Sequence, residues 1–520
     1  MRDRSFLWTR RLPTAQLLAA LPPGLRVARA ERLEDRRSVL DTLDRRLSRA
    51  GLELALVSAP EGLSLELRDA EGPTLEVPAE RAPAWAAELP AELHARVADL
   101  LEHRRLLPLW QLAERGTRYR VLDAQDKTLA RLALLGREAV ALPPPGSAAA
   151  PSLRATKLPR RLSLAPLRGY EGETEEVAKA LEEALGSAAE SFQDEAQELQ
   201  VALGLPLAVP ATRLVLELDP EEGAERAVRH LVAGLLGLLE AHREGARLGL
   251  DAEALHDFRV VLRRLRSTLR ELARLAPSRR LERLRQELAW LGERTGPQRD
   301  LDVLLEDLDA WIPALPAWCG EVLVPLLDAL QRERGLAQRE VARALASRRY
   351  SRLRERFALL LEGPAATSAP ASQPVARFAA RRLSRAARRV RQGAEQAGPH
   401  SSVAELHRLR ILAKRYRYLL ELFDSLFPAG ELAAIVDDLK ELQDFLGRHH
   451  DFAVQAEAIR SGAGRWLEGA AGGTEPALAL GYLLAKVEER RDALERDLAE
   501  VLEAYAGGKH AERERELFSC

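Results

Sequence analysis

Cysteine, methionine and lysine are scarce in this sequence of 520 residues. It contains two cysteines, Cys319 and Cys520, one methionine, and seven lysines among its 78 basic residues. Two cysteines cannot build the disulfide framework of a small secreted protein, which favours the reducing cytoplasm. The preference for Arg over Lys indicates a coding bias towards G and C. A run of arginines therefore needs support beyond its composition.

The sequence also lacks long apolar runs and has a formal net charge of only −1. No window of about 18 apolar residues could form a membrane span, and no apolar signal-peptide core follows the basic residues of 1–5. Because 78 basic and 79 acidic residues nearly cancel, any anion-binding site must be local. A hydrophobic content of 46% excludes wholesale disorder. We therefore expect a cytoplasmic protein without a membrane partner and, from its length, with about three domains.

The first 205 residues show a mixed pattern. Several short segments alternate between apolar and polar residues, as half-buried strands do, and Glu61-Gly62 is a hairpin turn signal. This pattern predicts an α+β domain over 1–205 with an antiparallel sheet, interrupted by a Pro-rich linker at about 143–152. The expected strands are 52–57, 63–67, 119–122 and 128–134, and the expected helices are 14–21 and 83–102.

After about residue 220 the apolar residues recur with a helical period almost throughout. A stretch rich in Ala, Pro and Ser at 363–374 and another rich in Gly at 462–476 interrupt the pattern. The sequence therefore predicts an all-α region, with one helical bundle over 218–365 and a second over 374–512.

The all-α region contains an internal repeat. Residues 255–266 read Leu-His-Asp-Phe-Arg-Val-Val-Leu-Arg-Arg-Leu-Arg, and 406–417 read Leu-His-Arg-Leu-Arg-Ile-Leu-Ala-Lys-Arg-Tyr-Arg. The same offset of 151 residues aligns Asp300 with Asp451 and about fifty residues without a gap. Two homologous four-helix bundles in tandem are the simplest explanation.

Both copies carry a row of basic residues that borders the apolar face of its helix. At about 100° per residue, the first row falls within an arc of about 80° and extends over about 21 Å of helix. Arg415 lies slightly off the arc, and Arg264, Arg270 and Arg415 are second-rank candidates for the site. The first row is His256, Arg259, Arg263, Arg266 and Arg270, and the second is His407, Arg410, Lys414 and Arg417.

A row of like charges is unfavourable by a few tenths of a kcal/mol per neighbouring pair. An extended polyanion lying along the row would compensate for this repulsion, because Arg offers bidentate geometry to phosphate oxygens and His can donate a hydrogen bond. We further hypothesise that the two rows face each other across one groove.

These helices resemble the CHAD family, whose helix reads roughly Leu-His-x-x-Arg-Val-x-x-Arg-Arg-Leu-Arg. Residues 406–423 are similar to the second family helix, and 296–303 to the family's Arg-Asp-x-Asp-Val segment, in which Arg299 would extend the basic surface. The resemblance covers about 218–510. It implies two four-helix bundles with a basic central groove that binds inorganic polyphosphate without catalysis or cofactor, often on polyphosphate granules.

Residues 1–200 resemble the CYTH domain, the tunnel-shaped sheet of triphosphate-processing enzymes. The resemblance rests on 41–52, which is similar to the family's Asp-Thr…Leu-x-x-x-Gly-Leu strand pair, and on 167–170. The family's opening Glu-x-Glu-x-Lys, which supplies metal ligands, is absent from the first strand candidate, 5–10. Phosphate chemistry of this kind needs a divalent metal held by carboxylates. We therefore expect a degenerate, non-catalytic domain.

Several alternatives stay open. His256-Asp257 and His449-His450-Asp451 could belong to a metal site, although Asp257 becomes Arg408 in the second copy. The histidines could simply pack in the bundles. Nucleic acid is the main rival ligand. In another alternative, the region is a helical scaffold whose basic row binds an acidic protein partner. The enzymatic alternative is a divergent triphosphatase, which would need several acids inside the sheet domain together with Arg118 and Arg120.

Overall fold

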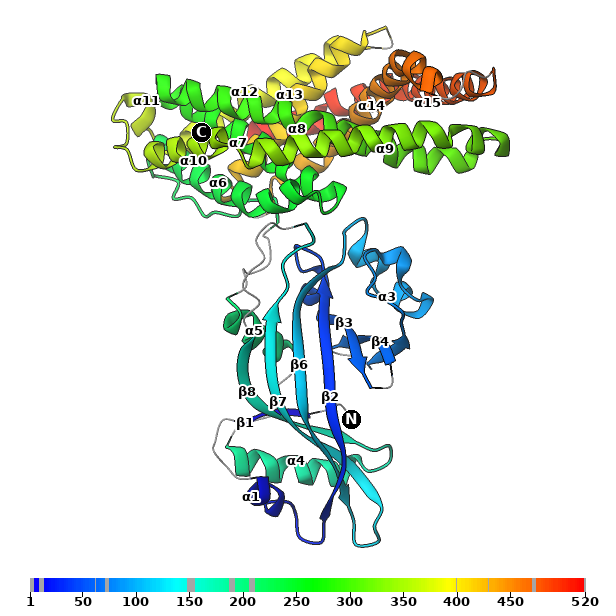
Figure 1. Cartoon of the computed structure of the whole chain (residues 1–520). Coiled ribbons are helices and arrows are strands. Elements are labelled where there is room, and N and C mark those ends of the chain that lie inside the picture. Colours follow the sequence, from blue (N-terminus) through cyan, green and yellow to red (C-terminus); the bar gives the residue numbers. More distant parts are fainter. Residues whose placement is uncertain are drawn as a thin grey trace. The chain divides into compact units, whose positions relative to one another are not determined.

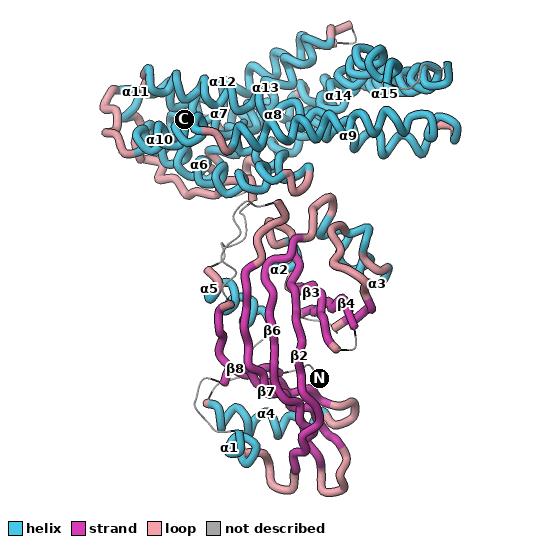
Figure 2. The backbone as a smooth tube through the Cα atoms, in the orientation of Figure 1, coloured by secondary structure: helices cyan, strands magenta, loops and turns pink. Residues whose placement is uncertain are grey.

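The computed structural model describes residues 4–8, 14–60, 62–70, 74–146, 155–186, 192–204, 211–398, 400–428, 430–469 and 474–518. The chain divides into two compact units, Met1–Pro210 and Ala211–Cys520. The first contains an antiparallel sheet with short helices, and the second is helical throughout (Figures 1 and 2). The expected change from α+β to all-α structure is confirmed.

The first unit is built on one eight-stranded antiparallel sheet with the strand order β1-β8-β7-β6-β2-β3-β4-β5. All four segments predicted as strands lie within its strands. The outer strands β1 and β5 of the described sheet do not pair with each other, so the sheet is not closed into a barrel. The strands are β1 (Arg4–Trp8), β2 (Arg26–Asp41), β3 (Leu52–Ala59), β4 (Gly62–Asp69), β5 (Leu75–Pro78), β6 (Leu107–Leu122), β7 (Thr128–Ala141) and β8 (Thr156–Pro166).

Short helices cover the two ends of this sheet. Helix α3 buries Leu93, Val97 and Leu101, spaced by one turn, against β2, β3 and β4. Helix α4 buries Val177 and Leu181 against β7 and β8 in a separate core. The helices are α1 (Thr14–Ala19), α2 (Arg46–Arg49), α3 (Ala91–Leu101), α4 (Glu171–Leu185) and α5 (Phe192–Ala202).

One prediction for this unit needs correction, and parts of others lie outside the described residues. The helix expected over 83–102 begins only at Ala91, because Pro90 has an extended ψ and starts the helix at the next residue. Glu61 of the predicted turn, 9–10 of the first strand candidate and 147–154 of the linker region lie outside the described residues.

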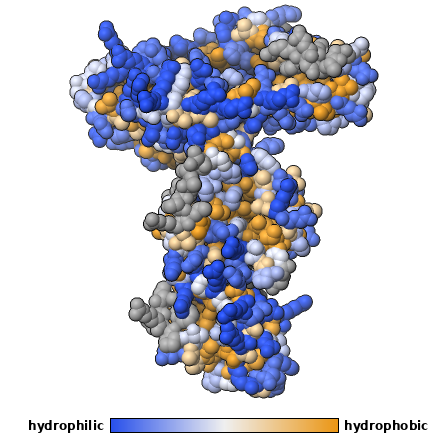
Figure 3. Space-filling model, viewed as in Figure 1, coloured by the Kyte–Doolittle hydropathy of each residue, from blue (hydrophilic) through white to orange (hydrophobic). Residues whose placement is uncertain are grey.

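The second unit is built from long helices with short connections. In Figure 3 the visible face of this unit is mostly hydrophilic. Among the described residues, no helix is both long and apolar enough to cross a membrane. The helices are α6 (Ala224–Leu248), α7 (Ala252–Leu275), α8 (Arg279–Trp311), α9 (Ala317–Leu345), α10 (Arg348–Leu361), α11 (Ala369–Ser372), α12 (Val375–Gln396), α13 (Val403–Leu422), α14 (Ala433–Gly469), α15 (Thr474–Ala506) and α16 (Gly508–Leu517).

The internal repeat is visible in the order of these helices. Helices α6 to α9 of the first copy correspond to α12 to α15 of the second, and both α7 and α13 begin at positions separated by the repeat offset. The two copies share one hydrophobic core, in which Phe258 of α7 and Tyr416 of α13 are fully buried. A smaller core joins the C-terminal part of α8 and the N-terminal part of α9 to α14 and α15. It contains the buried thiol of Cys319. Each copy therefore completes the core of the other.

The predicted interruption at 462–476 is wrong at its start. Helix α14 continues to Gly469, and α15 begins at Thr474. Isolated glycines at 462 and 464 lower helix propensity by only about 1 kcal/mol each, which a long helix tolerates. The interruption at 363–374 is confirmed in the main, since it separates α10 from α12 and contains only the short helix α11.

Candidate functional site

Capping residues at matching positions start the two helices that carry the basic rows. The Asp251 side chain accepts a hydrogen bond from the Ala254 amide at 2.6 Å at the start of α7. Ser402 and Glu405 form a capping box at the start of α13. Asp251 and Ser402 are one repeat offset apart. The caps therefore place His256 and His407 equivalently, in the second turn of each helix.

The two basic rows approach each other where α7 contacts α13. The pKa of the Lys414 ammonium is lowered to about 7, first by burial and then by the charges of the Arg410 and Arg263 guanidiniums. Burial and the neighbouring Arg263 likewise lower the pKa of Arg410. Arg263 comes from the first repeat, whereas Arg410 and Lys414 come from the second. The two copies thus contribute cations to one place.

Arg259 extends this group along α7. Its guanidinium donates to the Gly292 carbonyl at 3.1 Å and to the Thr295 hydroxyl at 3.0 Å, both on α8. Burial, followed by repulsion from Arg263, lowers the pKa of Arg259 to about 10. We call Arg259, Arg263, Arg410 and Lys414, with the histidines His407 and His450, the cationic cluster.

The two histidines of the cationic cluster stack on each other. The ring centroids of His407 and His450 are 4.3 Å apart, with a 36° angle between the planes. Burial and Arg410 lower the pKa of His450 to about 4, and the same causes lower the pKa of His407. Both rings are therefore neutral at neutral pH, and they can donate hydrogen bonds without adding charge.

Two carboxylates of the repeat lie beside the cluster. Asp451 accepts a hydrogen bond from Arg410 at 3.3 Å. Burial raises the pKa of Asp300, against the opposing effect of Arg259. These acids neutralise part of the positive charge and leave the cluster with a surplus of cations.

Several buried nitrogens of the cluster have no hydrogen-bond partner among the described residues. They are the Nε atoms of Arg259, Arg263 and Arg410 and the Nδ1 atoms of His407 and His450. A buried donor without a partner costs about 1–3 kcal/mol. The arrangement is therefore suited to a ligand that brings many acceptor oxygens.

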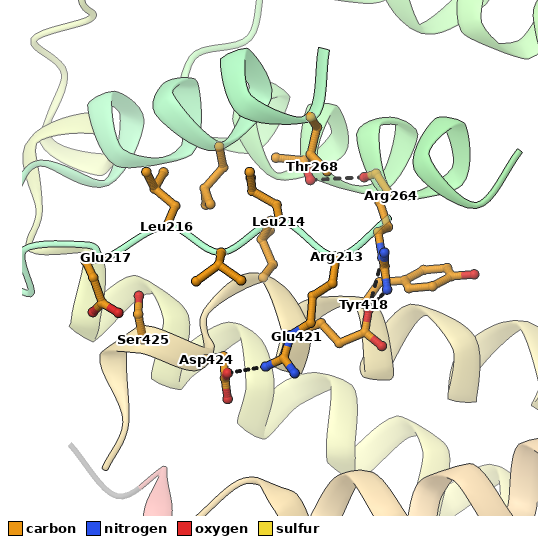
Figure 4. A pocket seen from close by; sticks show the side chains of 14 residues that line it. Arg213, Leu214, Leu216, Glu217, Arg264, Thr268, Tyr418, Glu421, Asp424 and Ser425 are labelled. Carbon is orange, nitrogen blue, oxygen red and sulfur yellow. Dashed lines mark hydrogen bonds and ion pairs between the residues drawn. The ribbon is translucent and has the colours of Figure 1, made fainter. Parts of the chain in front are cut away.

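The other residues of the predicted site are distributed around the cluster. Arg264 binds Glu421 at 2.7 Å and the Thr212 carbonyl, at the edge of a pocket covered by the extended segment 213–217 (Figure 4). Arg417 lies 3.5 Å from the same Glu421. Both guanidiniums are therefore engaged within the protein.

The remaining predicted residues differ in their exposure. His256 is half-buried, and Arg266 is exposed on α7. Arg299 lies 3.5 Å from Glu253. Arg270 and Arg415 lie close to each other. The pKa of Arg270 is lowered to about 10, first by burial and then by the charge of Arg415. The structure thus brings Arg259, Arg263, Arg410 and Lys414 together with His407, and places Arg270 and Arg415 in a neighbouring group.

Residues 230–460 match the sequence model of the CHAD domain. This segment forms a CHAD domain. It lies inside the region of about 218–510 that resembles the family in sequence, and it includes the whole cationic cluster. The comparison with solved structures returns the CHAD domain of the plant Ricinus communis, 29% identical with a TM-score of 0.47, over 56% of this chain and 96% of that chain. It also returns PptA from Streptomyces chartreusis, 24% identical with a TM-score of 0.41, over 55% and 99%.

The curated relatives are uncharacterized proteins of two strains of Mycobacterium tuberculosis. Each is 33% identical over 246 residues, which cover 46% of this chain. The match covers 45% of each relative, so the chain spans about half the length of the curated relatives that it matches.

The CHAD domain offers no clear metal site. Among the residues that the structure describes, no group of three or more His, Cys, Asp or Glu side chains could hold a metal ion. His449, which the metal alternative included, lies 3.1 Å from Glu495 and is buried. The cations around His450 would also repel a metal ion.

The sheet unit contains a second group of charges, on one face of its sheet. Arg37 and Arg68 pair with Glu53 and Glu66 at 2.7–3.6 Å. Deeper in the unit, the buried Arg137 and Arg161 pair with Glu195 and Glu198 of α5. Acids do enter this unit, as the enzymatic alternative requires, but each of these carboxylates is paired with a guanidinium.

Arg118 and Arg120 are not part of that group. Arg118 pairs with Glu31, and Arg120 is exposed. Asp41, from the segment that resembles CYTH, accepts hydrogen bonds from the Leu47 and Ser48 amides and stabilises the turn before β3. The matching segment is therefore structural in this protein.

Sequence reasoning missed two contributors to the CHAD domain surface. His450 appears above only in the metal alternative, yet it stacks directly on His407. The arginines of α12 were passed over because Arg is common throughout the chain. Their spacing by three and four residues at 382, 385 and 389 was the available signal.

Proposed function

We propose that this protein binds inorganic polyphosphate, without catalysis, at the cationic cluster of its CHAD domain. The observation that carries the proposal is the position of Lys414. It lies among Arg263, Arg410 and Arg417, close enough that its pKa falls to about 7 by burial and by their charge. A fold gains nothing from such crowding unless an anion occupies the site.

The chemistry of the cluster suits a linear polymer of phosphates. Arginine forms bidentate hydrogen bonds with phosphate oxygens, and the Nε atoms of Arg259, Arg263 and Arg410 lack partners among the described residues. A polyphosphate chain presents charge and acceptor oxygens at every unit. It would relieve both the repulsion between the cations and the cost of the unpaired donors.

Nucleic acid is a less suitable ligand, because the cluster has no aromatic platform. Single-stranded nucleic acids bind by stacking their bases on aromatic side chains. Tyr416 is fully buried, with its hydroxyl donating to Glu514 at 2.8 Å, and Tyr418 is 8% exposed. Neither ring presents a face to a base.

Binding should be tight for long-chain polyphosphate and should weaken steeply with salt. Each phosphate contact releases a condensed counterion, so log Kd should rise linearly with log salt, with a slope of about 0.7–0.9 per contact. The measurement is a salt series with purified full-length protein, using long-chain polyphosphate and single-stranded DNA of matched charge.

Comparable affinity for both polymers would replace polyphosphate by a general polyanion as the ligand. Binding to neither would return the basic rows to a structural role and favour a scaffold for another partner. Release of phosphate from polyphosphate or tripolyphosphate with added magnesium or manganese would contradict the non-catalytic part of the proposal. Association with polyphosphate granules in cells follows from the proposal as an expected localisation.

The affinity should also fall as the pH rises above about 7. In the free protein the Lys414 ammonium loses its proton near that pH, whereas a bound polyanion favours the charged form and raises the pKa. Binding above that pH therefore takes up a proton, and Kd must increase with pH. Titration at several pH values and constant ionic strength, with calorimetry in buffers of different ionisation enthalpy, measures the uptake.

Lys414→Arg is the matched control for this effect. A guanidinium stays charged throughout the range, so the variant should bind with a flatter pH profile, while the protonation of polyphosphate itself is unchanged. An identical pH profile in the two proteins would show that Lys414 does not titrate with binding.

A further inference from the structure

A second concentration of arginines lies next to the cationic cluster, where α12 packs against α7 and α13. A small cavity there is lined by six arginines and one carboxylate, Glu271. The arginines are Arg270 and Arg274 of α7, Arg382, Arg385 and Arg389 of α12, and Arg415 of α13. We call these six residues the α12 cluster.

The single acid does not neutralise the α12 cluster. Glu271 accepts two hydrogen bonds from Arg382, at 2.5 and 3.0 Å, and lies 3.5 Å from Arg274. Arg385, Arg389 and Arg415 are exposed and form no ion pair among the described residues. Three guanidiniums thus point their charge to solvent around one small cavity.

The α12 cluster continues the cationic cluster along the same helices. Arg263 and Arg270 are seven residues apart on α7, about 10 Å along the axis, and the exposed Arg266 lies between them. On α13, Arg415 directly follows Lys414. The pKa of Arg270 is lowered by burial and then by both Arg415 and Arg266, so the positive charge is continuous from one cluster to the other.

We propose that the α12 cluster is a second binding segment for the same linear polyphosphate chain, which runs from the cationic cluster along α7 and α13 to α12. This inference rests on the proposed function and adds a dependence on chain length. A short chain fills the cationic cluster alone, whereas a longer chain gains contacts with Arg385, Arg389 and Arg415. Both contacts belong to one molecule, so the second binding event is intramolecular and increases the affinity without a second ligand.

The test compares chain lengths in wild-type protein and in a triple variant, Arg385→Gln, Arg389→Gln and Arg415→Gln. These side chains are exposed, so the fold should be retained. For long chains the variant should bind about tenfold or more weakly, with a salt slope reduced by about two, as expected for three lost phosphate contacts. Tripolyphosphate should bind both proteins equally. In a series of defined lengths, the affinity of the variant should stop increasing at a shorter chain than that of the wild type.

A matched control separates local contacts from overall charge. Arg332, Arg339 and Arg352 on α9 and α10 are exposed and form no ion pair among the described residues. Replacing all three by Gln removes the same charge and should leave the chain-length dependence unchanged.

The outcomes separate the two proposals. If wild-type protein binds polyphosphate and the triple variant binds every length equally well, the α12 cluster plays no part and the inference is overturned, while the proposed function stands. An equal loss for tripolyphosphate and long chains would also overturn it, since the clusters would then not be successive segments. If wild-type protein binds no polyphosphate at all, the proposed function itself fails.

Discussion

Replacing Arg263 and Lys414 together by Glu is expected to lower the affinity for long-chain polyphosphate by about a hundredfold or more. Like charges facing each other across an interface cost several kcal/mol. The double reversal turns two attractive contacts at the centre of the cluster into repulsive ones. It changes both repeats at the point where Arg263 influences the pKa of Lys414.

The same variant should remain folded. In the free protein, Arg263, Arg410 and Lys414 repel one another, so the reversal replaces repulsion by attraction to Arg410. We expect a melting temperature that is equal to or higher than that of the wild type. Circular dichroism and thermal unfolding measure this directly.

The control for this experiment reverses two arginines elsewhere, Arg332→Glu and Arg352→Glu, which changes the net charge equally. This variant should bind almost normally. Retained binding of the Arg263→Glu, Lys414→Glu variant at moderate salt would contradict the assignment of the cationic cluster. Lost binding accompanied by unfolding would call for the milder Arg263→Gln, which should still weaken binding.

The second large effect concerns the stability of the sheet unit. Arg137→Ala should lower the free energy of unfolding by about 3–5 kcal/mol, the cost of breaking a buried ion pair from one side. The Arg137 side chain is fully buried and lies within 4 Å of Glu114, Glu195 and Glu198. Its removal leaves these carboxylates, which are mostly buried, with fewer partners.

The loss should be smaller at acidic pH. Burial alone would raise the pKa of Glu195, but the guanidiniums of Arg161 and Arg137 hold it below its ordinary value. Without Arg137 the carboxylate can protonate more readily, and the penalty then decreases. Denaturant unfolding of the full-length protein, with hydrogen exchange resolved by mass spectrometry, assigns the change to β6, β7 and β8.

Arg118→Ala is the matched control in the sheet unit. Arg118 pairs with Glu31 near the surface, where an ion pair contributes about 0–1 kcal/mol. A loss for Arg137→Ala no larger than this would show that the charged group on the sheet does not stabilise the unit.

Much of the fold was readable in the sequence because it depends on local periodicity. Alternation predicted the strands around 52–57 and 128–134, and the 3.6-residue period predicted the helical unit. The offset of 151 residues predicted the repeat. The helices α7 and α13 begin, and are capped, at positions separated by this offset. These features need only the geometry of one helix or strand.

Long-range packing decided the rest of the fold. The sequence did not reveal that the two copies share one core, since burial of Phe258 and Tyr416 together requires α6 to α8 and α12 to α14 to be assembled. The helical period also could not show whether Gly462 ends a helix. That depends on whether neighbouring helices offset a cost of about 1 kcal/mol.

The candidate site divides in the same way. The sequence by itself determined which residues form the basic rows, because helix geometry fixes their common face. Only the tertiary structure decided that Arg263 meets Lys414, whereas its neighbour Arg264 turns to Glu421. It alone brought His450 and the arginines of α12 to the surface of α7 and α13. The physical reason is that the electrostatic interactions and pKa values of these side chains depend on distances between helices. The periodicity within a single helix carries no information on those distances.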